Sequence, residues 1–333
     1  MGLSLSVSMS ARAAGTSGPA IEASSFCKSL VPGKYILPAK EGWWNWGMAP
    51  IYDESGKLHI FNSSIPYMRK KGMGYWPTKS IINHYVADSI EGPFELVSTA
   101  FSSETATYHN PQISKVGDTY VLVFLSKPAT NDSLQSIGMA TAKSLYGPWT
   151  ENPNNPIIKP VAGTSNAAHA SNPTFLVDRE GKFRIYYKSM SEGSRLREIS
   201  LAIADAIEGP YIDVPDNPLI SFRHLGRDIE DPYAFFYEDR YYMILEDRMD
   251  VAGALSGDSV PLKETKNGGL RPGFCLSQAM AFTGKGLNSA MIRMPRISEW
   301  NFRAVNALIF SGKMESLNIC SWRITAAKQL DSI

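Results

Sequence analysis

Short apolar runs on either side of a polar turn recur along the chain and predict β-hairpins. The pattern occurs in four segments, residues 51–61, 113–124, 175–187 and 234–245. In each, β-branched and aromatic residues flank a turn such as Asp53-Glu54-Ser55-Gly56 or Gly117-Asp118. Two such runs around a turn are the signature of an antiparallel hairpin, and helical periodicity is weak throughout the chain. The sequence therefore predicts an all-β protein.

Two short motifs repeat in step with these hairpins. Prolines 50, 111, 173 and 232 precede them at intervals of 61, 62 and 59 residues. A Gly-Pro-aromatic turn returns at the ends of residues 87–94, 142–149 and 204–211. Fixed-period repeats indicate one structural unit used several times. Each unit has room for four antiparallel strands, the last one entered through the Gly-Pro turn, and such a unit is a propeller blade.

We therefore expect a five-bladed β-propeller. Blades begin near residues 45, 106, 168 and 227, residues 1–30 form a flexible tail, and residues 31–333 form a single domain. Past Phe274 the blade signature does not recur, so the fifth blade is poorly matched and residues 275–333 are atypical. One hypothesis is a shifted reading frame near residue 275, since alternative codons could restore an Arg-Pro entry and a hairpin. Sequencing the locus would test it.

Bulk composition excludes several classes of function. The net charge is +1, from 33 basic and 32 acidic residues, so no basic excess indicates a nucleic-acid partner. No run of 18 apolar residues indicates a membrane span. The three cysteines, Cys27, Cys275 and Cys320, have no disulfide or metal spacing. The first 25 residues lack a clear secretory signal, which leaves localisation and oligomeric state open.

The residues before the repeated prolines are the candidate site. In a propeller they occupy equivalent places around one axial mouth, and here they are polar: His109-Asn110, Ser171-Asn172 and Glu230-Asp231. Such a ring suits a sugar, whose hydroxyl groups need directional donors and acceptors. Asn110, Asn172, His109 and the nearby His169 are therefore expected to bind substrate. A hydrogen-bonded structural histidine is the alternative for both histidines.

The stretch before Pro232 is the densest group of charges. Arg227, Asp228, Glu230 and Asp231 lie within five positions, and glycoside hydrolysis commonly uses two carboxyl groups. We expect Asp231 and Glu230 to be catalytic and Arg227 and Asp228 to contact substrate; a capped loop with a surface ion pair is the alternative. Residues 246–248 are expected to form a solvated turn.

The tryptophans that precede the first blade could stack on a sugar ring. Trp44 and Trp46, with Trp43 beside them, lie just before the first repeated motif. The alternative is that they are buried and close the propeller.

These motifs resemble the five-bladed propeller glycoside hydrolases, namely the family 43 arabinosidases and xylosidases and the family 117 enzymes that cleave 3,6-anhydro-L-galactose from agar oligosaccharides. Residues 44–61, 80–94, 108–124 and 229–245 carry the family 117 likeness, within coverage of about residues 35–272. The resemblance implies an inverting mechanism, with Asp231 matching the aspartate before the blade-four proline. Where family 43 members have a blade-one aspartate, this chain has Ala49.

The sequence thus predicts an exo-acting, inverting glycosidase that removes a terminal sugar from an oligosaccharide. No cofactor and no metal site are indicated by any ligand spacing. The alternatives are a non-catalytic carbohydrate-binding propeller, favoured by Ala49 and the atypical C-terminal region, and a protein-interaction platform.

Overall fold

Strands dominate the structure, a computed structural model. It describes residues 30–32, 43–66, 72–131, 133–237, 240–249, 251, 262–264, 270–272, 278–284, 290–293 and 322–324. Helix is limited to short segments such as the 3₁₀ turns η1 (Gly72–Tyr75) and η2 (Arg223–Leu225) and the single-turn α2 (Trp76–Lys79). The all-β prediction is confirmed over these residues. The predicted N-terminal tail and the region proposed to be frameshifted lie largely outside them.

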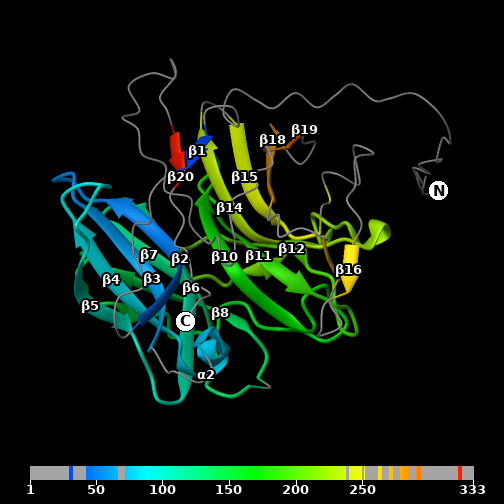
Figure 1. Cartoon of the computed structure of the whole chain (residues 1–333), viewed down its shortest axis with the longest axis horizontal. Helices are drawn as coiled ribbons and strands as arrows, with labels where there is room; N and C mark the ends of the chain where they lie inside the picture. The colour runs from blue at the N-terminus through cyan, green and yellow to red at the C-terminus, as the bar shows by residue number, and fades with distance from the viewer. Residues whose placement is uncertain are drawn as a thin grey trace.

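The N-terminal half of the described chain forms two antiparallel sheets of four strands (Figure 1). The first sheet has β2 (Trp43–Tyr52), β3 (Leu58–Pro66), β4 (Ile81–Ala87) and β5 (Glu95–Phe101). The second has β6 (Ala106–Val116), β7 (Thr119–Pro128), β8 (Ser136–Ala142) and β9 (Thr150–Glu151). In both, consecutive strands are neighbours, as in a meander.

Two further four-stranded sheets follow (Figure 1). The third has β10 (His169–Val177), β11 (Phe183–Met190), β12 (Glu198–Ala204) and β13 (Ile212–Asp213). The fourth has β14 (Ile229–Tyr237), β15 (Arg240–Asp247), β18 (Gln278–Gly284) and β19 (Ala290–Arg293). The hairpin of β16 (Leu262–Glu264) and β17 (Leu270–Pro272) interrupts the fourth sheet. This sheet therefore reaches Arg293, beyond Phe274, where the fifth repeat was expected to follow.

The two ends of the described chain lie side by side. The first strand, β1 (Leu30–Pro32), pairs in parallel with the last, β20 (Trp322–Ile324), to form a separate two-stranded sheet, and Figure 1 shows the two together. None of the described helices is long and apolar enough to cross a membrane.

Turn chemistry explains why the predicted hairpins form. Asp53 Oδ1 accepts hydrogen bonds from the backbone N–H groups of Ser55 and Lys57, each at 2.9 Å. Asp178 does the same for Glu180 and Lys182 in the third sheet. An aspartate that bonds its own following backbone stabilises a tight turn. The Gly-Pro turns also form as predicted, and each leads into the outer strand of its sheet.

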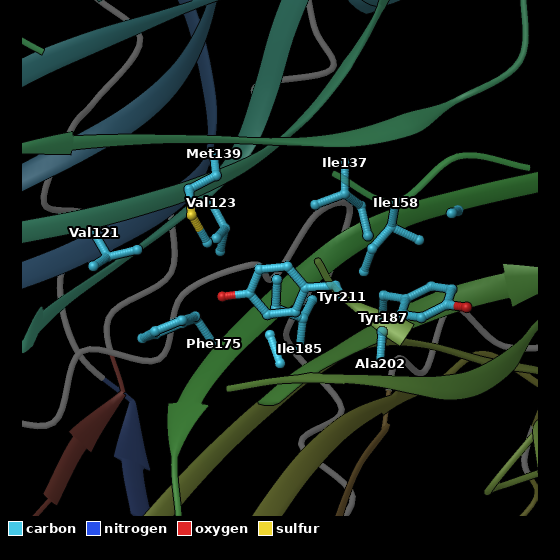
Figure 2. Close-up of a cluster of buried hydrophobic side chains, with 12 residues drawn as sticks. Val121, Val123, Ile137, Met139, Ile158, Phe175, Ile185, Tyr187, Ala202 and Tyr211 are labelled. Carbon is cyan, nitrogen blue, oxygen red and sulfur yellow. The ribbon is translucent and has the colours of Figure 1, made fainter. Parts of the chain in front are cut away.

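The hydrophobic core lies between neighbouring sheets. Val123 and Met139 of the second sheet pack against Phe175, Ile185 and Tyr187 of the third (Figure 2). Similar clusters join the first sheet to the second and the third to the fourth. The first strands β2, β6, β10 and β14 contact one another in sequence. The sheets therefore fan out around their first strands, which brings the segments with the repeated prolines together.

The packing between Gly138 and Phe124 allows a test of this core. A Cβ atom at Gly138 would lie 2.5 Å from Cε2 of Phe124, a ring that is completely buried. Because the ring cannot retreat, we expect Gly138→Ala to lower the free energy of unfolding by about 1–3 kcal/mol. Urea denaturation measures this change. Ser136→Ala, in the same strand but half-buried, should change stability by only about 0.5 kcal/mol; equal effects of the two variants would contradict this packing.

Candidate functional site

An irregularity in the first strand of each sheet shapes the site. Asn110, Asn172 and Asp231, each directly before a repeated proline, have φ angles of 50°, 48° and 56°. At each of them the pairing with the second strand is interrupted by a bulge. Among residues other than glycine, asparagine and aspartate tolerate this left-handed conformation best. The bulge therefore requires the same short polar side chains that make up the predicted ring.

The first sheet has its bulge two residues earlier than the proline spacing suggests. Pairing is interrupted between Trp46 and Met48, and Gly47 there has a φ of 58°. Ala49 instead pairs regularly with Phe61. The expectation that Ala49 occupies the place of the blade-one aspartate is therefore wrong, because the equivalent residue is Gly47. At that place the first sheet offers no side chain at all.

A chain of hydrogen bonds connects the four bulges. Trp46 Nε1 donates to Asn110 Oδ1 at 3.1 Å, and Asn110 Nδ2 donates to Asn172 Oδ1 at 2.6 Å. Asn172 Nδ2 in turn donates to Asp231 Oδ1. The structure thus joins Trp46 of the first sheet and the predicted residues of the other three sheets in one chain of hydrogen bonds. Each of the two amides accepts a hydrogen bond from one neighbour through Oδ1 and donates one to the next neighbour through Nδ2.

Glu230 lies at the centre of a buried ion-pair network. Lys188 Nζ lies 3.0 Å from its Oε2, Arg197 Nε lies 3.3 Å from the same oxygen, and Arg248 Nη1 contacts Oε1. The Glu230 side chain is only 12% exposed. Burial by itself raises the pKa of Glu230, but Lys188, Arg248 and Arg197 outweigh it and hold this pKa well below its usual range. Glu230 is therefore ionised, and the ion pair is not at the surface.

Asp231 and Glu246 have the opposite electrostatic character. Burial, followed by the negative charge of Glu230, raises the pKa of Asp231 to about 7. Burial and the charges of Glu230 and Asp231 raise the pKa of Glu246 well above its usual range. Glu246 pairs directly with Glu230 across β14 and β15, where two like charges would repel each other. The site therefore holds one ionised carboxylate beside two carboxyl groups that keep protons.

The prediction of a solvated turn at residues 246–248 is wrong. Asp247 is fully buried, Glu246 is 8% exposed, and the Arg248 side chain is 12% exposed. Asp247 Oδ1 accepts a hydrogen bond from the backbone N–H of Val251. These residues end the second strand of the fourth sheet, next to the bulge, so they belong to the site.

Asp228 and Arg227 support the network from outside it. Asp228, nearly fully buried, accepts a hydrogen bond of 2.5 Å from Arg197 Nη1. It therefore fixes the arginine that also contacts Glu230. Arg227 donates instead to the backbone carbonyl of Met249. The structure gives both residues contacts within the protein, whereas the sequence suggested contacts to substrate.

Both candidate histidines are buried and neutral. Burial, with the nearby charges of Lys188 and Lys127, lowers the pKa of His109 to about 3. Burial, with Lys188 and Arg197, lowers that of His169 to about 3. His109 Nδ1 and His169 Nε2 have no hydrogen-bond partner among the described residues. A neutral imidazole with an unused nitrogen can donate to or accept from a ligand hydroxyl group.

The tryptophans that precede the first blade differ in burial. Trp46 is buried at 7% exposure and belongs to the polar ring through its indole N–H. Trp43 and Trp44 are half-buried. A further tryptophan, Trp76 of α2, also reaches this region, since its ring lies 5.3 Å from that of His109. The repeat analysis missed Trp76 because it lies between β3 and β4, outside the repeated motifs.

Lys188 was also missed, although the sequence contained a signal for it. It pairs with Ser171 opposite the third-sheet bulge, the same place that Glu246 takes opposite Glu230. Lys188 is a charged residue within a strand that is otherwise largely apolar and aromatic. Aligning the second strands of the repeats, as well as the first, would have placed Lys188 and Glu246 at the axis.

The carboxylates of this site do not suit a metal ion. Oxygen atoms of Glu230, Asp231 and Glu246 lie within 4.8 Å of one another, a spacing that could hold a cation. Lys188, Arg197 and Arg248 already surround Glu230, however. A divalent ion here would be repelled by three fixed positive charges. Cationic side chains thus take the role that a metal would have.

Comparison with known proteins finds likeness in structure and not in sequence. No protein-family profile and no curated protein matches the chain in sequence. Among solved structures, Zg3597, a family 117 glycoside hydrolase of the marine bacterium Zobellia galactanivorans, matches with a TM-score of 0.57 and 16% identity. The match covers 81% of this chain and 75% of that one.

Other carbohydrate-active enzymes share the architecture. CoXyl43, a family 43 β-xylosidase/α-arabinofuranosidase from a compost metagenome, matches with a TM-score of 0.50 and 15% identity, over 80% of this chain and 82% of that one. The family 32 β-fructofuranosidase BmSUC1 of Bombyx mori has the same score and identity, over 73% and 47%. The chain therefore has the fold of the β-propeller glycoside hydrolases, and the predicted resemblance to families 43 and 117 is confirmed at the level of fold.

The raised pKa of Asp231 makes a prediction for stability. Its pKa is higher in the folded than in the unfolded state, so its contribution to stability is greatest at low pH and is lost as pH rises through about 7. Asp231→Asn removes that loss. We expect the free energy of unfolding of the variant, relative to that of the parent, to rise by roughly 1–3 kcal/mol from pH 5 to pH 8. Urea unfolding at the two pH values measures the gain, and a pH-independent difference would contradict it.

Glu230→Gln is the matched control for that experiment. The pKa of Glu230 is lower in the folded than in the unfolded state, so its effect on stability has the opposite pH dependence. Ionised Glu230 stabilises the fold above its unfolded pKa, and this contribution is lost as pH falls through its folded pKa. Removing the charge at pH 7 leaves Lys188, Arg197 and Arg248 without their shared partner. The expected loss is about 3–5 kcal/mol.

Proposed function

We propose that the protein is an exo-acting, inverting glycoside hydrolase that removes a terminal sugar from an oligosaccharide. The observation that carries the proposal is Asp231, which lies in the polar ring with a pKa of about 7, beside the ionised Glu230. A carboxyl group that titrates near neutral pH suits proton transfer to and from a leaving oxygen. The fold of the propeller hydrolases supports the same proposal.

In this mechanism the residues of the ring have separate roles. Asp231 gives its proton to the glycosidic oxygen as the bond to the sugar breaks, and its Oδ1 is held by Asn172. Glu230 is held ionised by three cations, and its negative charge raises the pKa of Asp231, which keeps the acid protonated until the reaction. The neutral imidazoles of His109 and His169 bind sugar hydroxyl groups.

The distances restrict how inversion can occur. Inverting enzymes keep their two carboxyl groups about 6.5–9.5 Å apart so that a water molecule fits between sugar and base. Oxygen atoms of Glu230, Asp231 and Glu246 are within 4.8 Å of one another. The three therefore supply one side of the reaction, the acid, and the carboxylate that activates water belongs to another part of the chain.

We also propose that the four sheets belong to a five-bladed propeller. The first strands form an open series from β2 to β14, and the parallel pair of β1 and β20 joins the two ends of the chain. In this proposal the pair of β1 and β20 lies at the fifth position. An experimental structure with β14 packed directly against β2 would contradict it.

A second candidate function is carbohydrate binding without catalysis. Gly47 gives the first sheet no side chain at the place where the other three sheets have Asn110, Asn172 and Asp231. The hydrogen-bonding ring would still bind a sugar if no carboxylate elsewhere activates water. Hydrolysis and binding must therefore be measured separately.

A hydrolysis screen tests the leading proposal. The purified protein and its Asp231→Asn variant would be incubated with agar-, arabinan- and xylan-derived oligosaccharides. We expect the parent to release a terminal sugar and the variant to lose at least about 100-fold in rate, as removal of a general acid does. NMR of the first product formed would show whether the anomeric configuration is inverted. Binding without release from any substrate would favour the second candidate.

The pH dependence of hydrolysis should report on Asp231. If Asp231 acts as the acid, the rate falls as pH rises through about 7. Glu230→Gln removes a negative charge and leaves three cations nearby, and both changes lower the pKa of Asp231. The alkaline limb should therefore move to lower pH in this variant. The measurement is kcat/KM from pH 4 to 9, and an unmoved limb would assign it to another group.

A further inference from the structure

A second group of aromatic residues lies next to the polar ring, outside the acid cluster. Trp76, in α2, has its ring 5.3 Å from that of His109 in an edge-to-face arrangement. The ring of Trp46 lies 5.9 Å from His109 on another side. His109 directly precedes Asn110 of the ring. The three side chains therefore form a cluster that adjoins the polar ring at Asn110.

The polar atom at the centre of this cluster has no partner. His109 is 2% exposed, and its Nδ1 makes no hydrogen bond to the described residues. A buried polar atom left in this state costs about 1–3 kcal/mol relative to a satisfied one. A bound hydroxyl group would supply the missing bond. A low pKa of about 3 keeps the imidazole neutral, so no anion is needed to balance it.

The segment that carries Trp76 is held in place. Lys127, whose residue is 3% exposed, donates to the carbonyl oxygen of Pro77 at 3.2 Å and also to that of Thr130. Ser80 Oγ donates to the carbonyl oxygen of Trp76 at 2.6 Å. These two hydrogen bonds from a buried lysine to backbone carbonyls tie the segment to β7. Trp76 is thus positioned before any ligand arrives.

Trp76 is also only half-buried, unlike Trp46. An indole face packs well on the C–H groups of a sugar ring, and a nearby imidazole nitrogen fixes the ring's orientation through one hydroxyl group. Stacking combined with a single directional hydrogen bond is a typical arrangement for binding a neutral sugar.

We propose that Trp76, Trp46 and His109 form a second sugar subsite, which binds the residue adjacent to the one held at Asp231. The inference rests on the proposed carbohydrate site and deepens it: the ligand is a neutral oligosaccharide of at least two residues. Trp76 stacks on the second sugar, and His109 Nδ1 bonds one of its hydroxyl groups. The segment of residues 72–79 thereby sets the minimum length of the substrate.

The test measures how affinity depends on ligand length. Isothermal titration would compare mono-, di- and trisaccharides of the agar, arabinan and xylan series, with Asp231→Asn as the background so that nothing is cleaved. Trp76→Ala should weaken binding of di- and trisaccharides about tenfold and leave monosaccharide binding unchanged. Trp76→Phe, which retains an aromatic face, should restore most of the affinity. Thermal unfolding of each variant establishes that it is folded.

Tyr52→Ala is the matched control. Tyr52 is an aromatic residue of the first sheet with 46% exposure, at the far end of β2 from Trp46. Its removal should leave every affinity unchanged. Equal loss for mono- and disaccharides in Trp76→Ala, or no loss at all, would overturn the subsite, as would absence of binding by every oligosaccharide.

The outcomes separate this inference from the proposed hydrolysis. If the parent hydrolyses oligosaccharides and its chain-length preference equals that of Trp76→Ala, the hydrolase proposal stands and the subsite proposal is wrong. A protein that binds disaccharides through Trp76 and releases no sugar keeps the subsite and loses the hydrolase proposal.

Discussion

The left-handed residue before each repeated proline is the constraint on which the site depends. At that residue the chain leaves the regular pleat, and the bulge turns the side chain towards the neighbouring sheet. Asn110, Asn172 and Asp231 satisfy two demands at once, because they tolerate the backbone conformation and supply hydrogen-bonding groups. The backbone geometry and the chemistry of the ring therefore have the same cause.

The charges around Asp231 follow from that geometry. The bulge places Glu230 opposite Glu246, and the equivalent position in the third sheet supplies Lys188. Lys188, Arg197 and Arg248 all contact Glu230 and keep it ionised. The carboxyl groups of Asp231 and Glu246 are buried next to its negative charge. Their protons are retained for this reason. The division between one ionised and two protonated groups is a property of the cluster as a whole.

Much of the fold could be predicted from the sequence because turns are local. Asp53 and Asp178 form their turns with residues two and four positions away, and the Gly-Pro turns are equally local. The register of the first sheet could not be obtained in this way. Whether Gly47 or Ala49 is equivalent to Asn110 depends on where the bulge lies, and the proline spacing does not reveal that.

The candidate site was predictable where it followed the repeat and unpredictable elsewhere. Asn110, Asn172 and Asp231 were found because they precede repeated prolines. Glu246 and Arg248 resembled a surface turn because burial depends on what packs over a strand end, which the local sequence does not encode. Trp76 lies between β3 and β4, outside the repeated motifs, so repetition gave no information about it.

The hydrogen-bond chain from Trp46 to Asp231 has a direction, and that direction limits how the sequence can diverge. Each amide accepts through Oδ1 and donates through Nδ2, so the chain begins at an obligate donor, the indole N–H, and ends at an accepting oxygen of the Asp231 carboxyl group. An aspartate at position 110 would present an acceptor to the acceptor of Asn172. Positions 46, 110 and 172 lie in three different sheets, and yet a change at any one of them alters what its neighbour in the chain must donate or accept.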